Sequence, residues 1–113
     1  MALSERVRSH LRVLASRRET ITYRDLAKAL ELDPPNVIHQ VTEALEVLIH
    51  EDHENGAPLI AALVVSKVRG GVPAPGFFQL ARLLGRYGGP DAGPEAEAHH
   101  AREIARAWPY WGG

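Results

Sequence analysis

The sequence of 113 residues contains no cysteine, and aromatic residues account for only 6% of it. Without cysteine the chain cannot form a disulfide bridge, and it offers neither a thiol nucleophile nor thiolate metal ligands. Long apolar runs are also missing, because the longest run, residues 59–65, is far too short to span a bilayer. The first ten residues lack an apolar segment of the signal-peptide type, so we expect a cytoplasmic protein.

A surplus of charge of one sign is missing as well, since the formal net charge is −1 at pH 7. The charges nevertheless form blocks, with +4 over residues 1–28, −7 over 29–57, +4 over 58–86 and −2 over 87–113. A bipolar chain of this kind can present a basic face to a polyanion despite its near-neutral total. The alternative is that the blocks neutralise one another within the fold or in a dimer.

What the chain does have is enough apolar residues, 45% of the total, to build the core of one domain. We expect a single domain over residues 1–113. It divides into a core (1–86), a glycine- and proline-rich linker (87–94), and a C-terminal helix with an aromatic end (95–113).

Hydrophobic periodicity predicts five helices, at about residues 4–17, 23–30, 34–53, 78–86 and 95–107. Ser4, Thr22 and Asp33 are the predicted N-caps of the first three. The continuous apolar run at 59–66 predicts a buried strand, and residues 67–76 a hairpin or loop with a second short strand near Val72 or Phe77. The predicted fold class is therefore α+β, with about five helices and a small two- or three-stranded antiparallel sheet.

Residues 21–45 (ITYRDLAKALELDPPNVIHQVTEAL) resemble a bacterial helix-turn-helix. Ala27 is the small residue of the first helix, Leu30 and Leu32 flank the turn, and Val37, Val41 and Ala44 are the apolar positions of the recognition helix. Residues 57–78 resemble the wing that follows such a motif in winged-helix proteins. One position departs from the pattern, because Glu31 stands where the turn usually has glycine. The resemblance implies a winged-helix-like DNA-binding domain.

Residues 22–27 (TYRDLA) also resemble the first motif helix in the DNA-binding half of alkylguanine-DNA alkyltransferases and alkyltransferase-like proteins. The acceptor motif of that family, Pro-Cys-His-Arg, and its tryptophan-containing counterpart are missing here, so the repair activity does not carry over. Over nearly its whole length the chain is similar to small uncharacterised prokaryotic proteins. That group shares TYxDLA-like, ALVVSK-like and PYW-like segments and implies no activity.

The candidate DNA contacts come from three segments. Asn36, His39 and Gln40 would touch the groove, Lys67 and Arg69 would contact phosphate from the wing, and Tyr23 and Arg24 would meet the DNA backbone. The alternative interpretation is an ordinary solvated helix face and hairpin tip. Arg8, Arg12 and Arg17 could support phosphate contacts or pair with the acidic third helix.

No arrangement typical of an enzyme stands out. The chain has no nucleophile–base constellation and no Walker loop, and His50 and His53 lack the spacing of the zinc-protease motif. We therefore predict no catalytic residue, metal or cofactor. The expected function is a non-enzymatic DNA-binding protein, a small prokaryotic regulator that binds double-stranded DNA. The alternative is a protein-interaction module: an adaptor, an immunity or inhibitor protein, or an assembly subunit.

The aromatic end contains Trp108, Tyr110 and Trp111. Large aromatic rings bury well and anchor interfaces, so this end could hold a second copy of the chain or another protein. The alternative is that the last helix folds back and the rings cover the protein's own core. No membrane contact is predicted.

Overall fold

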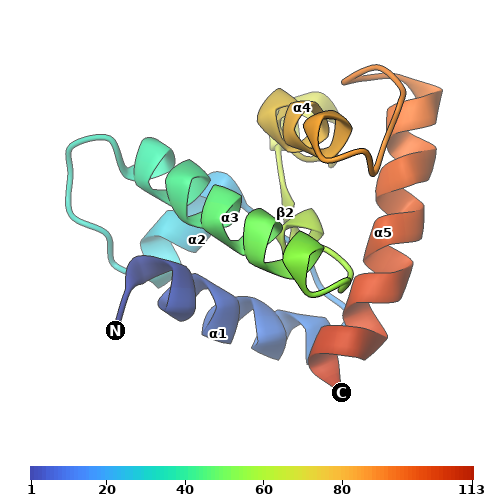
Figure 1. Cartoon of the computed structure of the whole chain (residues 1–113). Helices are drawn as coiled ribbons and strands as arrows, with labels where there is room; N and C mark the ends of the chain where they lie inside the picture. Colours follow the sequence, from blue (N-terminus) through green and yellow to red (C-terminus); the bar gives the residue numbers. More distant parts are fainter.

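The computed structural model describes residues 1–113, and five α-helices dominate it (Figure 1). They are α1 (Leu3–Ser16), α2 (Tyr23–Ala29), α3 (Val37–Glu54), α4 (Pro75–Leu83) and α5 (Pro94–Gly112). The short elements are β1 (Ile21–Thr22), the 3-10 helix η1 (Ile60–Leu63), β2 (Val64–Val65) and the 3-10 helix η2 (Lys67–Arg69). The predicted five helices and small sheet are confirmed. No helix combines the length and the apolar character needed to cross a membrane.

The sheet consists of β1 and β2, which run parallel, with Ile21 opposite Val64 and Thr22 opposite Val65. The prediction of an antiparallel sheet is therefore wrong. Parallel neighbours need a long crossover between them, and here α2, α3 and η1 supply it by returning the chain to the side from which β1 started. Beyond β2 the chain makes the expected tight turn, but only one antiparallel bridge, between Ser66 and Val72, closes it.

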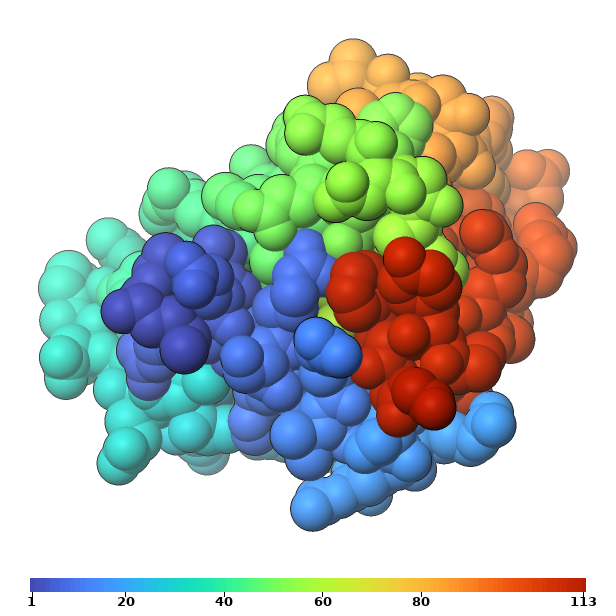
Figure 2. All heavy atoms as spheres, turned by 60° about the horizontal axis from the view of Figure 1, so that its bottom comes forward, coloured from blue at the N-terminus to red at the C-terminus, as the bar shows by residue number.

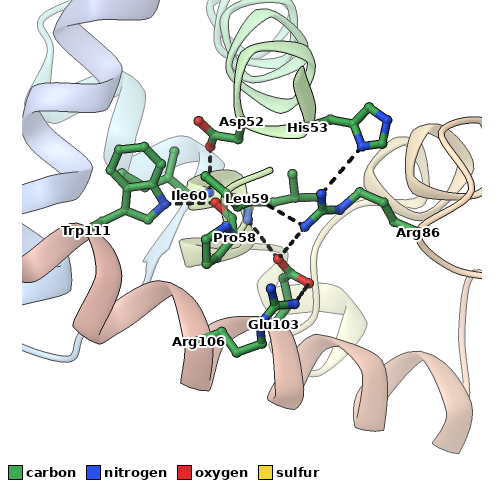
Figure 3. Close-up of polar contacts among 10 residues, drawn as sticks. Asp52, His53, Pro58, Leu59, Ile60, Arg86, Glu103, Arg106 and Trp111 are labelled. Carbon is green, nitrogen blue, oxygen red and sulfur yellow. Dashed lines mark hydrogen bonds and ion pairs between the residues drawn. The ribbon is translucent and has the colours of Figure 1, made fainter. Parts of the chain in front are cut away.

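Two buried carboxylates explain why most of the apolar run is not a strand (Figure 3). Asp52 Oδ2 accepts a hydrogen bond from the Ile60 N–H at 3.0 Å, and Glu103 Oε2 accepts one from the Leu59 N–H at 2.8 Å. These side chains bond backbone groups that a neighbouring strand would otherwise bond. The run therefore turns as η1, whose four residues are all buried at the centre of the core.

The helix starts show which capping predictions hold. Thr22 caps α2 as predicted, because its Oγ1 accepts a hydrogen bond from the Asp25 N–H at 3.1 Å. The other two caps are wrong: α1 is preceded by Ala2, and α3 begins at Val37 after Asn36. The late start of α3 follows from the two prolines at 34 and 35, since a residue before proline is driven out of the helical conformation.

The core lies where α1, α3 and α5 meet η1. α1 and α3 lie side by side, and α5 packs on α1 and η1 (Figure 1). The last turns of α5 lie against α1, as Figure 2 also shows. α5 extends five residues beyond its predicted end, so the aromatic segment is helical. Trp108 Nε1 donates to the Glu19 carbonyl at 3.2 Å, and Trp111 Nε1 donates to the Pro58 carbonyl at 2.9 Å.

The aromatic end therefore covers the protein's own core with its two tryptophans. Both rings are half-buried against the same chain, whereas Tyr110 is 57% exposed. Only Tyr110 remains as a large free aromatic surface for a second protein. The dimer or partner contact expected at this end stays a prediction.

Candidate nucleic-acid interface

Residues 21–45, which resemble a helix-turn-helix in sequence, form β1, α2, a connecting loop and the first half of α3. Ala27 and Leu30 are buried on the α2 side, and Val41 and Ala44 are buried on the α3 side. α2 packs directly on α3. Glu31, in the turn between them, has a φ of 53°, in the left-handed region that glycine adopts at lower cost. Glu31 therefore adopts a conformation that glycine would adopt at lower cost.

This conformation gives a direct prediction for the turn. Replacing Glu31 by glycine should raise the free energy of unfolding, by up to about 1 kcal/mol, because the left-handed strain is removed at the cost of a more flexible unfolded chain. The matched control is Glu46→Gly, at an exposed position inside α3, which should lower the free energy of unfolding by about 1 kcal/mol. Urea unfolding measures both. A loss of stability in Glu31→Gly as large as in the control would contradict the interpretation.

A groove of about 640 Å³ opens between α2, α3 and the segment around η2. Its walls are the start of α2, the first half of α3 and the turn from β2 into η2. It brings together three of the predicted site residues, Tyr23, Arg24 and Lys67. This is the region of the molecule in which the expected DNA-contacting residues of different segments meet.

Tyr23 lines the groove and links two of the segments that form it. Its hydroxyl oxygen accepts a hydrogen bond from the Ala74 N–H at 2.9 Å, which ties the first residue of α2 to the segment before α4. Burial raises the pKa of Tyr23, outweighing the opposite effects of the Ala74 N–H and of Arg69. The phenol is therefore neutral, and its own hydrogen remains available to an acceptor in the groove.

Arg24 and Lys67 are exposed cations on separate walls of the groove, and neither forms an ion pair within the chain. The carboxylate in the same groove is that of Asp25. With these three charges the groove carries a surplus of one positive charge. Cations without an internal partner are those that bind an external anion at the lowest cost, because no ion pair has to be broken.

The three residues predicted to touch the DNA groove, at the start of α3, lie outside the groove described above. Gln40 Nε2 already donates to the carbonyl oxygens of Asp33, at 2.9 Å, and of Pro35, at 3.0 Å. His39 Nε2 lies 2.7 Å from Glu43 Oε1 on an exposed face of α3. Asn36 is exposed just before the helix, in the left-handed conformation. None of the three lines the groove.

Ile38 and Thr42 are the residues of α3 that do line the groove, and the sequence analysis missed them. They are four residues apart, so they share one face of the helix. Ile38 is nearly half exposed although it is apolar. Ile38 lies on the same side of α3 as the buried Val41 and Leu45, three and seven residues later, and this spacing was the available signal.

Arg69 points away from the groove. Its guanidinium donates to the carbonyl oxygen of Asp91, so it fastens the turn after β2 to the segment before α5. The carboxylate of Asp91 pairs with Arg82 and accepts a hydrogen bond from Gln79, and these contacts hold the pKa of Asp91 below its usual range. Arg69 is thus engaged in a structural contact and does not line the groove.

The arginines of α1 are also partly engaged. Arg8 pairs with Glu51 and Asp52, and Arg6 donates to the Leu30 carbonyl oxygen at 2.6 Å. For Arg8, pairing with the acidic third helix is therefore the arrangement found. Arg12 and Arg17 are exposed and form no ion pair.

Comparison with protein-family models, with curated proteins and with solved structures finds no match to this chain. The interpretation of the groove therefore depends on its own geometry and charges.

Proposed function

We propose that this protein is a non-enzymatic, winged-helix-like DNA-binding protein that acts as a small prokaryotic regulator. The observation that carries the proposal is the groove beside the helix-turn-helix, where Arg24 of α2 and Lys67 of η2 are exposed without ion-pair partners. Cations from two segments along one groove suit the phosphates of a nucleic-acid strand.

Under this proposal different residues of the groove contact the phosphates and the bases. Arg24 and Lys67 contact phosphates, and the Tyr23 hydroxyl donates to a phosphate oxygen between them. Ile38 and Thr42 face the bases, where an apolar side chain can meet the thymine methyl group. The Thr42 hydroxyl donates to the Ile38 carbonyl oxygen at 3.0 Å, so its oxygen is the part that can accept a hydrogen bond from a base. Asn36 and His39 contribute from the edge of the recognition helix, and Gln40 and Arg69 support the loops that carry these contacts.

Alanine substitutions of the two free cations test the proposal. Arg24→Ala and Lys67→Ala should each weaken binding of a labelled duplex by about three- to tenfold at ~50 mM salt, because each removes one phosphate contact. Arg12→Ala is the matched control, an exposed arginine of α1 that does not line the groove, and it should bind like the parent protein. Fluorescence anisotropy measures the affinities. Equal effects of all three substitutions would contradict binding in the groove.

A protein-interaction module is the second candidate function, and the apolar rim of the same groove favours it. Val68 is 94% exposed, and Ile38 is exposed on the opposite wall. Such side chains fit an extended protein segment that carries both apolar and acidic residues. This candidate predicts that no duplex binds even at low salt.

A further inference from the structure

A second cavity, of about 410 Å³, lies between the segment after α4 and the middle of α5. Only ionisable side chains line it: Arg86, His99, Arg102, Glu103 and Arg106. Three guanidinium groups face one carboxylate, so the cavity carries a formal charge of +2 with the histidine neutral. It shares no lining residue with the groove of the proposed function.

The single carboxylate of Glu103 offsets only part of the positive charge of the three arginines. Its carboxylate is buried and accepts the Leu59 N–H at 2.8 Å, and Arg86 Nη2 lies 3.3 Å from Glu103 Oε2 (Figure 3). Arg106 Nη1 is 3.7 Å from Glu103 Oε1, which is too long for a hydrogen bond, and its side chain is 59% exposed. Arg102 forms no ion pair. Arg102 is therefore free to bind an external anion, and Arg106 is held only by its long ion pair with Glu103.

Two buried donors point to a ligand at the same place. His99 is 8% exposed and stacks on the Tyr87 ring with the centroids 4.3 Å apart, and its Nε2 is buried without a hydrogen-bond partner. The Nε–H of Arg86 is buried and unpartnered as well, although both its terminal nitrogens have partners. Buried polar atoms in proteins are nearly always bonded, so each of these two nitrogens lacks a bond that an acceptor would supply.

We propose that this cavity binds a phosphate monoester of a small molecule, with its phosphoryl oxygens held by Arg102, Arg106, Arg86 Nε and His99 Nε2. The donors come from several directions, which suits a tetrahedral group with three free oxygens better than a planar carboxylate. The charge of +2 matches a monoester dianion more closely than the single charge of a nucleic-acid phosphodiester. The cavity volume lies in the range of small-molecule sites and leaves room for the esterified group.

NMR titrations of the full chain test this proposal. The amide and histidine-ring resonances are recorded while three probes are added in separate experiments. Inorganic phosphate and a nucleoside 5′-monophosphate should shift the resonances of His99 and Arg102 with saturation, and the unphosphorylated nucleoside should not. A duplex without terminal phosphates is the fourth arm. If the duplex alone shifts His99, the phosphate comes from nucleic acid and the monoester assignment is wrong.

The double variant Arg102→Ala/Arg106→Ala should weaken the binding of both phosphate probes at least tenfold. Arg12→Ala/Arg17→Ala, which removes an exposed arginine of α1 and the exposed arginine that follows the helix, is the matched control and should leave it unchanged. His99→Phe keeps a ring on Tyr87 but removes the donor, and should weaken binding several-fold without loss of the fold. Shifts that fail to saturate, or equal affinities in the two double variants, would overturn the proposal. Non-saturating shifts or equal affinities here would leave the proposal of DNA binding in the groove untouched, because the two sites share no lining residue.

Discussion

Replacing Asp52 by alanine is expected to lower the free energy of unfolding by about 3–5 kcal/mol, the range found when one partner of a buried ion pair is removed. Asp52 is 1% exposed. Its Oδ1 lies 2.8 Å from Arg8 Nη1, and its Oδ2 accepts the Ile60 N–H at 3.0 Å. Alanine leaves the largely buried Arg8 without its inner partner and leaves a buried N–H unbonded. Urea unfolding followed by tryptophan fluorescence measures the loss.

Two further variants separate the charge from the hydrogen bond at Asp52. The substitution Asp52→Asn keeps an acceptor for the Ile60 N–H, so it should lose clearly less stability than Asp52→Ala. Glu51→Ala removes the exposed partner of the same arginine, and should cost less than about 1 kcal/mol. If Asp52→Ala were no more harmful than Glu51→Ala, the buried carboxylate would not be holding η1 in place.

The second large effect is a loss of stability as the pH falls through the ordinary histidine range. Burial lowers the pKa of both His99 and His100 below the usual value of 6.5. For His99, Glu103 opposes this change, while Arg102, Arg86 and His100 add to it. For His100, the hydrogen bond to the Ala62 carbonyl opposes it. The two rings are therefore neutral in the folded protein over a range in which they are protonated in the unfolded chain.

The direction in which the free energy of unfolding changes with pH follows from the number of protons that each state binds. Below pH 6.5 the unfolded chain binds more protons than the folded protein, so the free energy of unfolding falls with the pH until the lower folded pKa values are reached. Each unit by which a folded pKa lies below the unfolded value contributes about 1.4 kcal/mol to this change. Urea midpoints in phosphate-free buffers between pH ~8 and ~5 measure the change.

The double variant His99→Phe/His100→Gln should flatten this pH dependence, because the glutamine amide can still donate to the Ala62 carbonyl. His50→Gln, at an exposed position of α3, is the control and should leave the slope unchanged. An equally steep loss of stability in the double variant would show that other groups titrate on unfolding.

Local features of the fold could be predicted from sequence because their causes lie close together in the chain. The helices follow from apolar periodicity, and the Thr22 cap is decided within four residues. The strand expected at 59–66 is shortened to Val64–Val65, because the carboxylates that bond its first residues, Asp52 and Glu103, lie eight and 44 residues away. An apolar run without periodicity does not distinguish a strand from a buried turn of helix.

The candidate site could be predicted only in part, for the same reason. Tyr23, Arg24 and Lys67 meet in one groove, as their expected shared role requires. The engagement of Arg69 by Asp91 could not be foreseen, because it joins residues 22 positions apart across a linker. The face of α3 that lines the groove depends on how α2 and η2 pack beside it, which the spacing of residues along α3 does not specify.

The salt dependence of duplex binding tests the central claim most directly. A protein that contacts two to four phosphates should lose affinity with a slope between about −2 and −4 in a plot of log affinity against log salt concentration. We expect this slope for the parent protein between ~50 and ~200 mM salt, and a slope smaller by about 2 in Arg24→Ala/Lys67→Ala. The double variant Arg12→Ala/Arg17→Ala should keep the parent slope. No binding at the lowest salt, or an unchanged slope without Arg24 and Lys67, would contradict DNA binding in the groove.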